Sequence, residues 1–318
     1  MHTLSKSFSH AFFYFFLFSL AFPFSNVHGE ENASPTLSIK PMEYKHAVTK
    51  IPESSWTFLK ESFSKESIGP WALIISSTTL LYAFDEEILL EVQRWGRQLN
   101  IGNTDKTKSF IQAGQMNIFR GPTDFGSTLY FLGDGWMHAG IGLGFIGIGE
   151  ASNDPRALNT GIQIFHGMFV STLFCQILKR STGRESPEVR TQKRGRWQLF
   201  PSFEQYNTKT PHYDAFPSGH VMTSVMTFTV IIENYPEYSW FLLPLEYTWV
   251  TLLSLQMINN GVHWASDYPL GIAMGYLAGK IVTRYGREET TIAKKSSPWI
   301  VLPVIEENTY GLWVNYRF

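Results

Sequence analysis

Two histidines and one aspartate in the second half of the chain have the types and spacing that nucleophilic or acid–base chemistry requires. His220 ends a Pro-Ser-Gly-His stretch at 217–220 and stands at the start of an apolar run, while His263 is followed four residues later by Asp267. On a helix this spacing places both side chains on one face, so a carboxylate reaches one ring nitrogen and makes the other a better nucleophile or base. Alone, such a pair is more often a surface or core contact than a catalytic one.

The turn before His220 has the features of an anion site. Ser218 is a suitable N-cap for the helix that the apolar run predicts, and Gly219 permits a tight turn. Backbone amides at a helix N-terminus carry partial positive charge. Two imidazoles beside such amides suit phosphoryl transfer, in which one ring attacks phosphorus and the other donates a proton to the leaving group.

The segment 178–187 adds positive charge. Lys179 and Arg184 flank a Thr-Gly turn just after a predicted helix, and we expect both to bind phosphate. The basic residues that follow or accompany them are interpreted as a solvated, charged loop: Arg180, Arg190, Lys193, Arg194 and Arg196.

Together these segments resemble the type 2 phosphatidic acid phosphatase superfamily, whose site is shared with vanadium haloperoxidases. That family carries a Lys-x6-Arg-Pro segment, a Pro-Ser-Gly-His segment and a Ser-Arg-x5-His-x3-Asp segment, in this order. The stretch 217–220 matches the middle segment in full, Lys179 and Pro187 match the first, and His263 and Asp267 match the last. The resemblance covers about residues 70–286, and the motifs are specific as a set although each is modest alone.

The resemblance implies an all-α fold, a helical bundle with its site at the helix ends. It implies that His263 attacks phosphorus and forms a phosphohistidine, that Asp267 orients this ring, and that His220 protonates the leaving oxygen. Lys179 and the Ser218–Gly219 turn would hold the phosphate. The family chemistry requires no metal and no cofactor.

The chain departs from the family pattern at two arginines. Ser186 stands where the first segment has its arginine, and Met257 stands where the last segment has its own. Arg184 is the nearest cation to Ser186, while Asn259 and Asn260 are neutral donors near Met257. Each lost charged hydrogen bond costs about 1.5–3 kcal/mol, which is roughly tenfold to a hundredfold in rate. These departures predict a site that is slow, unusually selective or inactive.

Hydrophobic patterning predicts a bundle of about six core helices followed by a short C-terminal β-hairpin. The expected helices span 71–94, 125–148, 161–179, 221–233, 240–257 and 263–283. The chain divides into a signal peptide at 1–29, a polar leader with a short helix at 56–66 within 30–69, a phosphatase-like helical domain at 70–290, and the hairpin at 296–318. Glycines at 133–149 are interpreted as a helix-packing face.

The N-terminal segment predicts export. Residues 1–29 combine a lysine, a short apolar core and a small residue at the end, which is the layout of a secretory signal peptide and favours a periplasmic destination. An uncleaved anchor is the alternative. Because Asp134, His138 and Glu246 interrupt apolar stretches, we favour a soluble bundle over a membrane-embedded one, with contact to a membrane surface left open.

Charge and cysteine content exclude some classes of protein. The formal net charge of −1 gives no general attraction to nucleic acid. The single cysteine, Cys175, cannot form an internal disulfide and is expected to be buried.

The sequence thus predicts an exported, metal-independent phosphatase that hydrolyses a phosphomonoester, with a lipid phosphate or a prenyl diphosphate as candidate substrates. A weakened or inactive family member that binds phosphate or lipid is the alternative, and vanadate-dependent halide oxidation is a third hypothesis. The expected partner is a small-molecule or lipid phosphate, not nucleic acid, and the oligomeric state is left open.

Overall fold

The structure is a computed structural model that describes residues 36–104, 107–113, 116–290, 299–306 and 309–316. The predicted mostly helical fold is confirmed. The α-helices are α2 (His46–Thr49), α3 (Ile51–Ser62), α4 (Ile68–Gln98), α5 (Phe125–Phe131), α6 (Gly135–Ser152), α7 (Pro155–Thr182), α8 (Phe203–Thr208), α9 (Gly219–Asn234), α10 (Ser239–Asn259) and α11 (Tyr268–Val282). Single 3-10 turns are η2 (Lys65–Ser67), η3 (Pro187–Val189), η4 (Thr210–His212), η5 (Pro236–Tyr238) and η6 (Ala265–Asp267).

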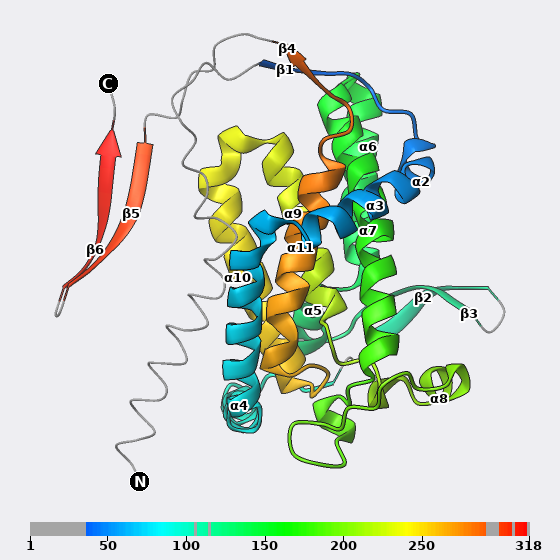
Figure 1. Ribbon diagram of the computed structural model, residues 1–318, viewed down its shortest axis with the longest axis vertical. Coiled ribbons are helices and arrows are strands. Elements are labelled where there is room, and N and C mark those ends of the chain that lie inside the picture. Colours follow the sequence, from blue (N-terminus) through cyan, green and yellow to red (C-terminus); the bar gives the residue numbers. More distant parts are fainter. Residues whose placement is uncertain (1–35, 105–106, 114–115, 291–298, 307–308, 317–318) are drawn as a thin grey trace.

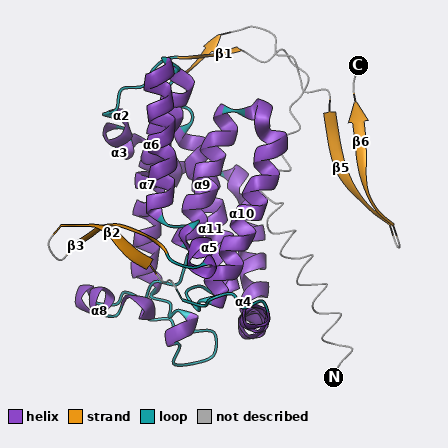
Figure 2. Ribbon diagram, turned by 180° about the vertical axis from the view of Figure 1, so that it is seen from behind, coloured by secondary structure: helices purple, strands orange, loops and turns teal. Residues whose placement is uncertain are grey.

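Short strands accompany the bundle as antiparallel pairs. They are β1 (Thr36–Ile39) with β4 (Arg287–Thr290), β2 (Thr107–Ala113) with β3 (Met116–Pro122), and β5 (Trp299–Glu306) with β6 (Thr309–Tyr316). The β2–β3 hairpin projects from the bundle between the segments predicted as helices at 71–94 and 125–148 (Figure 2). Strands β5 and β6 fall within the predicted hairpin segment, whereas the predicted signal peptide lies outside the described residues.

Local capping explains where several helices begin and end. At the start of α7, the Asp154 carboxylate accepts a hydrogen bond from the Arg156 amide at 2.8 Å. The same helix ends at Gly183, whose φ of +54° is a left-handed conformation that glycine adopts without strain. The predicted helix at 125–148 is two helices, because the Asp134 side chain accepts from the Trp136 amide and starts α6 afresh.

Two other predicted boundaries differ from the structure. The helix expected at 263–283 begins only at Tyr268, so His263 lies in the loop before it. The short helix of the leader is α3, which begins at Ile51, five residues earlier than the expected start.

Helix α9 lies in the middle of the bundle, with α11 beside it (Figure 1). Most of its side chains are buried, which is the pattern of a helix packed on all sides. Val221 and Val225 join a core cluster with α4 and α10, whereas Met222, Met226 and Val230 join a second cluster with α7 and α11. The two clusters together fix the orientation of α9, whose first turn carries His220.

Glycines at every fourth position of α11 let its backbone approach α9 closely. A Cβ built at Gly271 would lie 2.7 Å from the Ser218 carbonyl oxygen, and one at Gly275 would lie 2.3 Å from the Met222 carbonyl oxygen. Gly279 faces Thr229 in the same way. No side chain fits at these contacts without moving the helices apart.

The glycine-rich segment of α6 has two different faces. Gly142 and Gly149 pack against α7, where a Cβ would lie 3.0 Å from Phe165 and 2.4 Å from the Leu158 amide respectively. Gly144 and Gly147 meet nothing within 4 Å. The predicted packing face is therefore confirmed for part of the segment.

In the described part of the chain, three helices are long and apolar enough to cross a membrane: Lys65–Gln98, Pro155–Thr182 and Pro236–Asn259. Each exposes large apolar side chains, among them Ile75, Leu173 and Trp240. Glu246 was one reason to expect a soluble bundle. It does not oppose a membrane-spanning α10, because its side chain is 2% exposed and buried within the protein. The structure therefore supports membrane association rather than the soluble bundle that the sequence favoured.

The α9–α11 contact predicts unequal effects of alanine at two glycines. Gly275→Ala should lower the free energy of unfolding by about 1–3 kcal/mol, because its methyl group meets a backbone carbonyl. Gly147→Ala, in open space on α6, should raise it by up to about 1 kcal/mol through helix propensity. Thermal unfolding of both variants in one detergent measures the difference, and an equal or higher midpoint for Gly275→Ala would contradict the close contact.

Candidate functional site

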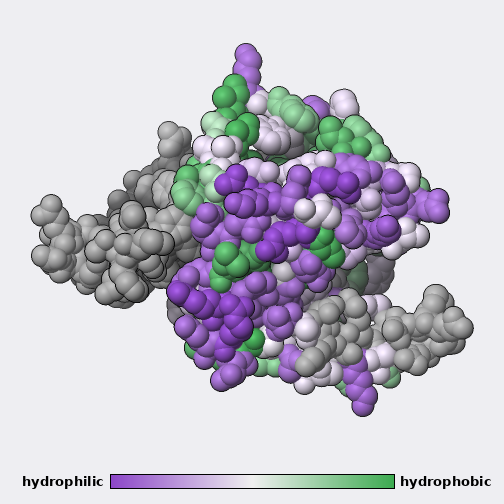
Figure 3. Space-filling model, turned by 90° about the horizontal axis from the view of Figure 1, so that it is seen from below, coloured by the Kyte–Doolittle hydropathy of each residue, from purple (hydrophilic) through white to green (hydrophobic). Residues whose placement is uncertain are grey.

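The predicted site segments meet at one end of the bundle, where α7 and α10 end and α9 and α11 begin (Figure 1). Lys179 lies in the last turn of α7, Ser218 caps α9, and His263 lies between α10 and η6. The surface at this end is mostly hydrophilic (Figure 3).

The two histidine rings lie side by side. The centroids of His220 and His263 are 6.0 Å apart with an interplanar angle of 69°. His220 is half-buried and packs against the Tyr130 ring at 5.1 Å, whereas His263 is 2% exposed. Gly133 makes room for this arrangement, since a Cβ at that position would lie 2.6 Å from the Cβ of His220.

A backbone carbonyl orients the His263 ring. Its Nδ1 lies 2.7 Å from the Ala215 carbonyl oxygen, which only accepts hydrogen bonds. Nδ1 therefore carries the hydrogen in the neutral ring, and Nε2 keeps a free lone pair. The Asp267 carboxylate is also close, with its Oδ2 3.5 Å from Nδ1. The expected shared helix face is wrong, because His263 lies before the helix, and its closer partner is Ala215. That Asp267 helps to orient the ring stays a prediction.

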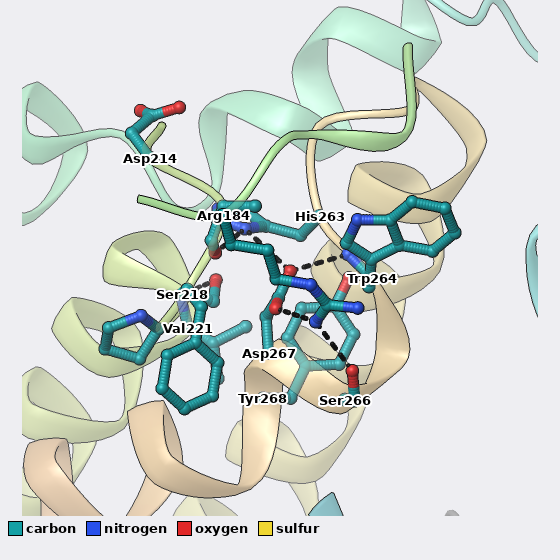
Figure 4. Close-up of polar contacts among 12 residues, drawn as sticks. Arg184, Asp214, Ser218, Val221, His263, Trp264, Ser266, Asp267 and Tyr268 are labelled. Carbon is teal, nitrogen blue, oxygen red and sulfur yellow. Dashed lines mark hydrogen bonds and ion pairs between the residues drawn. The ribbon is translucent and has the colours of Figure 1, made fainter. Parts of the chain in front are cut away.

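Asp267 is committed chiefly to two other partners. Its Oδ2 accepts from the Trp264 amide at 2.7 Å, and its Oδ1 accepts from Arg184 (Figure 4). These bonds hold the His263–Asp267 loop as a closed turn. The Asp267 backbone carbonyl also accepts from the Ser218 amide at 3.0 Å, which ties this turn to the start of α9.

Arg184 occupies a different place from the predicted one. Its guanidinium is fully buried and donates to Asp85 at 2.7 Å, to Ser266 at 2.7 Å and to Asp267. The rings of Tyr82, Trp197 and Trp264 surround it, with centroids 4.9–5.3 Å from its central carbon. Arg184 is thus a buried brace that links α4 to η6. The expected contact between Arg184 and phosphate does not fit this position, because the side chain is fully buried and both terminal nitrogens already donate to protein groups.

Lys179 lies beneath the turn that carries Ser218 and Gly219. It is 6% exposed, its Nζ donates to the Asp214 carbonyl, and the Asp214 carboxylate is 3.7 Å away. A Cβ at Gly219 would lie 3.8 Å from the Cε of Lys179 and 3.5 Å from the buried Cys175 sulfur. The lysine is therefore next to the turn, as expected, with Asp214 as a partner that sequence reasoning missed.

The predicted cap of α9 is confirmed. The Ser218 hydroxyl accepts from the Val221 amide at 3.4 Å, and the residue is fully buried. Capping leaves open whether Ser218 and Gly219 also hold phosphate, and that role stays a prediction.

A pocket of about 280 Å³ adjoins the histidine pair. Its lining residues are Asn103, Thr104, Tyr130, Ser186, Glu188, Pro211, Asp214, Asn260 and Val262. Ser186, at the position of one family arginine, lines this space, whereas Met257, at the position of the other, is fully buried in the apolar core. Among the described residues that line the pocket, no lysine or arginine replaces either of these arginines. Among the described residues, no cluster of three or more His, Cys, Asp or Glu side chains could hold a metal ion.

Glu185 fixes the loop that leads into the site. Its buried carboxylate accepts from the Thr191 amide at 3.0 Å and the Arg196 amide at 2.9 Å. Burial alone would raise the pKa of Glu185, but these hydrogen bonds outweigh it and the pKa is lowered. Because the folded-state pKa is depressed, this contribution to stability is present above the unfolded-state pKa and is lost on acidification.

Comparisons with known proteins give one family match and several similar proteins. The profile described as the PAP2 superfamily matches residues 160–290, a range that contains every predicted site residue. Decaprenylphosphoryl-5-phosphoribose phosphatase of Mycobacterium tuberculosis, from strain CDC 1551 / Oshkosh and from strain H37Rv, is 27% identical over 173 residues, or 54% of this chain and 81% of the relative. A transmembrane PAP2 type phosphatidylglycerolphosphate phosphatase from Bacillus subtilis aligns structurally with a TM-score of 0.41 and 14% identity, over 76% of this chain and 96% of that one.

Removing the buried guanidinium should destabilise the protein strongly. Arg184→Met leaves Asp85 and Asp267 buried without their cation and should lower the free energy of unfolding by about 3–5 kcal/mol. Arg94→Met breaks an exposed pair with Glu91 and should change it by about 1 kcal/mol or less. Chemical or thermal unfolding compares the two variants, and similar losses in both would refute the role of Arg184 as a brace.

Proposed function

The chain belongs to the PAP2 superfamily, and on this premise we propose that it is a phosphatase that hydrolyses a phosphomonoester through a phosphohistidine at His263. The observation that supports this most is the histidine pair itself. The rings of His220 and His263 are 6.0 Å apart, and the Ala215 carbonyl leaves Nε2 of His263 with its lone pair.

The proposed reaction has two steps. In the first, Nε2 of His263 attacks phosphorus, the P–N bond forms, the P–O bond to the alcohol breaks, and His220 gives the leaving oxygen a proton. In the second, His220 takes a proton from water as the water oxygen attacks phosphorus and the P–N bond breaks. Inorganic phosphate leaves and both imidazoles return to their starting states.

Charge stabilisation comes from few groups. Lys179 and the amides at the N-terminus of α9 supply positive potential beside the turn. Lys179 shares its charge with Asp214, and the two family arginines are replaced by Ser186 and Met257. We therefore expect slow turnover of simple phosphates, with much of the transition-state stabilisation drawn from the rest of the substrate.

A lipid phosphate is the proposed substrate. The apolar surfaces of α4, α7 and α10 support a membrane location, and the mostly hydrophilic site end supports a phosphate group held at the membrane surface (Figure 3). The mycobacterial relative is named for a decaprenylphosphoryl substrate, which supports a polyprenyl lipid. Export to the periplasm remains part of the proposal and rests on residues 1–29 of the sequence.

The membrane location predicts how the protein fractionates. After expression of the full chain, the protein should stay with the membrane pellet through alkaline carbonate extraction and be released by detergent. Release by carbonate alone would contradict spanning helices and indicate attachment at the surface. A protein found in the soluble fraction would contradict membrane association altogether.

The histidine pair predicts distinct losses in two variants. His263→Ala should abolish release of phosphate from p-nitrophenyl phosphate and from a phosphatidic acid, both measured with chelator present, because no nucleophile remains. His220→Asn should reduce turnover about 10²–10⁴-fold for the alkyl ester, which needs a protonated leaving group, and less for p-nitrophenyl phosphate. Radiolabelled substrate should give an acid-labile phosphoenzyme in the wild type and none in His263→Ala.

His46→Asn, on the distant helix α2, is the matched control and should retain wild-type turnover. Full activity in His263→Ala would refute the mechanism. Ser186 and Met257, at the two arginine positions, are the reason to keep the binding-protein alternative. Saturable binding of phosphate or lipid without turnover would identify such a protein. Halide oxidation that appears only with added vanadate would identify the third hypothesis.

A further inference from the structure

We propose that the pocket beside the histidine pair binds a polyhydroxylated group of the substrate, a sugar or another polyol that stands next to the scissile phosphate. The proposal rests on the phosphatase function proposed above and specifies which substrates the same site prefers. It is carried by one buried amide that has no hydrogen-bond partner and by the chemistry of the groups around it.

Three lining residues connect the pocket to the proposed reacting groups. Tyr130 in its wall packs against His220, Val262 precedes His263 in the chain, and Asp214 pairs with Lys179. Its volume of about 280 Å³ far exceeds the roughly 30 Å³ that one water occupies in the liquid. A group bonded to a phosphate at the histidine pair would enter this space.

Asn260 lines the pocket and carries an amide nitrogen that is not used elsewhere. Its Nδ2 is buried without a hydrogen-bond partner among the described residues, and the residue as a whole is 8% exposed. The orientation of its amide is fixed by Gln256, whose Nε2 donates to the Gly102 carbonyl at 2.7 Å and to the Asn260 Oδ1 at 2.7 Å. Because a backbone carbonyl only accepts, Gln256 must donate, Asn260 must accept with Oδ1, and Nδ2 must face the other way.

Gln256 and Asn259 also hold the part of the pocket wall that follows Gly102. The Gly102 carbonyl accepts from Gln256 and also from the Asn259 Nδ2 at 3.1 Å, and the next residues in the chain, Asn103 and Thr104, line the pocket. A buried donor without an acceptor has lost its hydrogen bonds to water and gained none in return. A ligand that supplies an acceptor to Asn260 would provide the missing hydrogen bond.

The lining groups match hydroxyls better than they match an anion. Asp214 and Glu188 contribute carboxylates, which accept hydrogen bonds and repel a phosphate, while Asn103, Thr104 and Ser186 contribute amide or hydroxyl groups. A polyol hydroxyl both donates and accepts, so it satisfies the carboxylates and the Asn260 amide together. A cationic head group fits less well, since the charge of Asp214 is already paired with Lys179.

Ser186 explains why the space exists. It stands where the family pattern has an arginine, and it lines the pocket with a short side chain. An arginine at this position would extend into the pocket and fill it with charge. Serine at position 186 thus removes a side chain that could bind phosphate and leaves space for a group next to the phosphate.

The test compares two phosphate esters of primary alcohols, ribose 5-phosphate and n-pentyl phosphate, on the full chain in detergent. The wild type should show a kcat/KM ratio of at least tenfold in favour of ribose 5-phosphate. Asn260→Asp keeps the acceptor for Gln256 but removes the donor, and should lower this ratio about tenfold. Ser186→Arg should also lower it by filling the pocket, whereas Asn207→Asp, at an exposed amide on α8, should leave the ratio unchanged.

The outcomes separate this proposal from the function on which it rests. Turnover of p-nitrophenyl and pentyl phosphates with a wild-type ratio near one would refute the polyol subsite and leave the phosphatase intact. A preference for O-phosphoethanolamine over ribose 5-phosphate would refute the polyol subsite and indicate that the pocket binds a cationic group. No turnover of any ester would refute both proposals, and a ratio unaffected by both Asn260→Asp and Ser186→Arg would refute the assignment of these residues.

Discussion

A single buried guanidinium joins the parts of the chain from which the site is built. Arg184 pairs with Asp85, which precedes it by 99 residues, and with Asp267, which follows it by 83. Charges removed from water require close partners, so α4, the loop after α7 and the turn η6 cannot separate without exposing or orphaning one of them. Because Asp267 also binds the Trp264 amide, the same pairing fixes the backbone on either side of the His263 loop.

Close backbone contacts complete the geometry that this ion network begins. The α11 glycines bring α9 near enough for the Ser218 amide to reach the Asp267 carbonyl, so the turn carrying His220 and the turn carrying His263 are bonded to each other. The Ala215 carbonyl then sets the tautomer of His263. The histidine pair is thus held by contacts within the bundle, and the neighbouring pocket is where the proposed substrate selectivity would arise.

Features of the fold and site that depend on neighbouring residues in the chain could be predicted from the sequence. The cap at Ser218 and the burial of Cys175 each depend on a few neighbouring residues, and the sequence predicted both. The Thr-Gly turn after the predicted helix 161–179 was also recognised, although the helix continues to Thr182. The ion partners of Arg184 were missed because Asp85 is distant and looks like any polar residue of an amphipathic helix. The Ala215 carbonyl was missed because a backbone group leaves no sequence signal. The spacing of Gly271, Gly275 and Gly279 was readable and marks the α9 contact.

The central claim is that the Ala215 carbonyl holds the Nδ1 hydrogen of His263 and leaves Nε2 to attack phosphorus. The most direct measurement is the phosphorus-31 NMR spectrum of the trapped, denatured phosphoenzyme, which distinguishes the two phosphorylated nitrogens of histidine. All label is expected on Nε2 of His263. Label on Nδ1, on His220 or on another residue would contradict it.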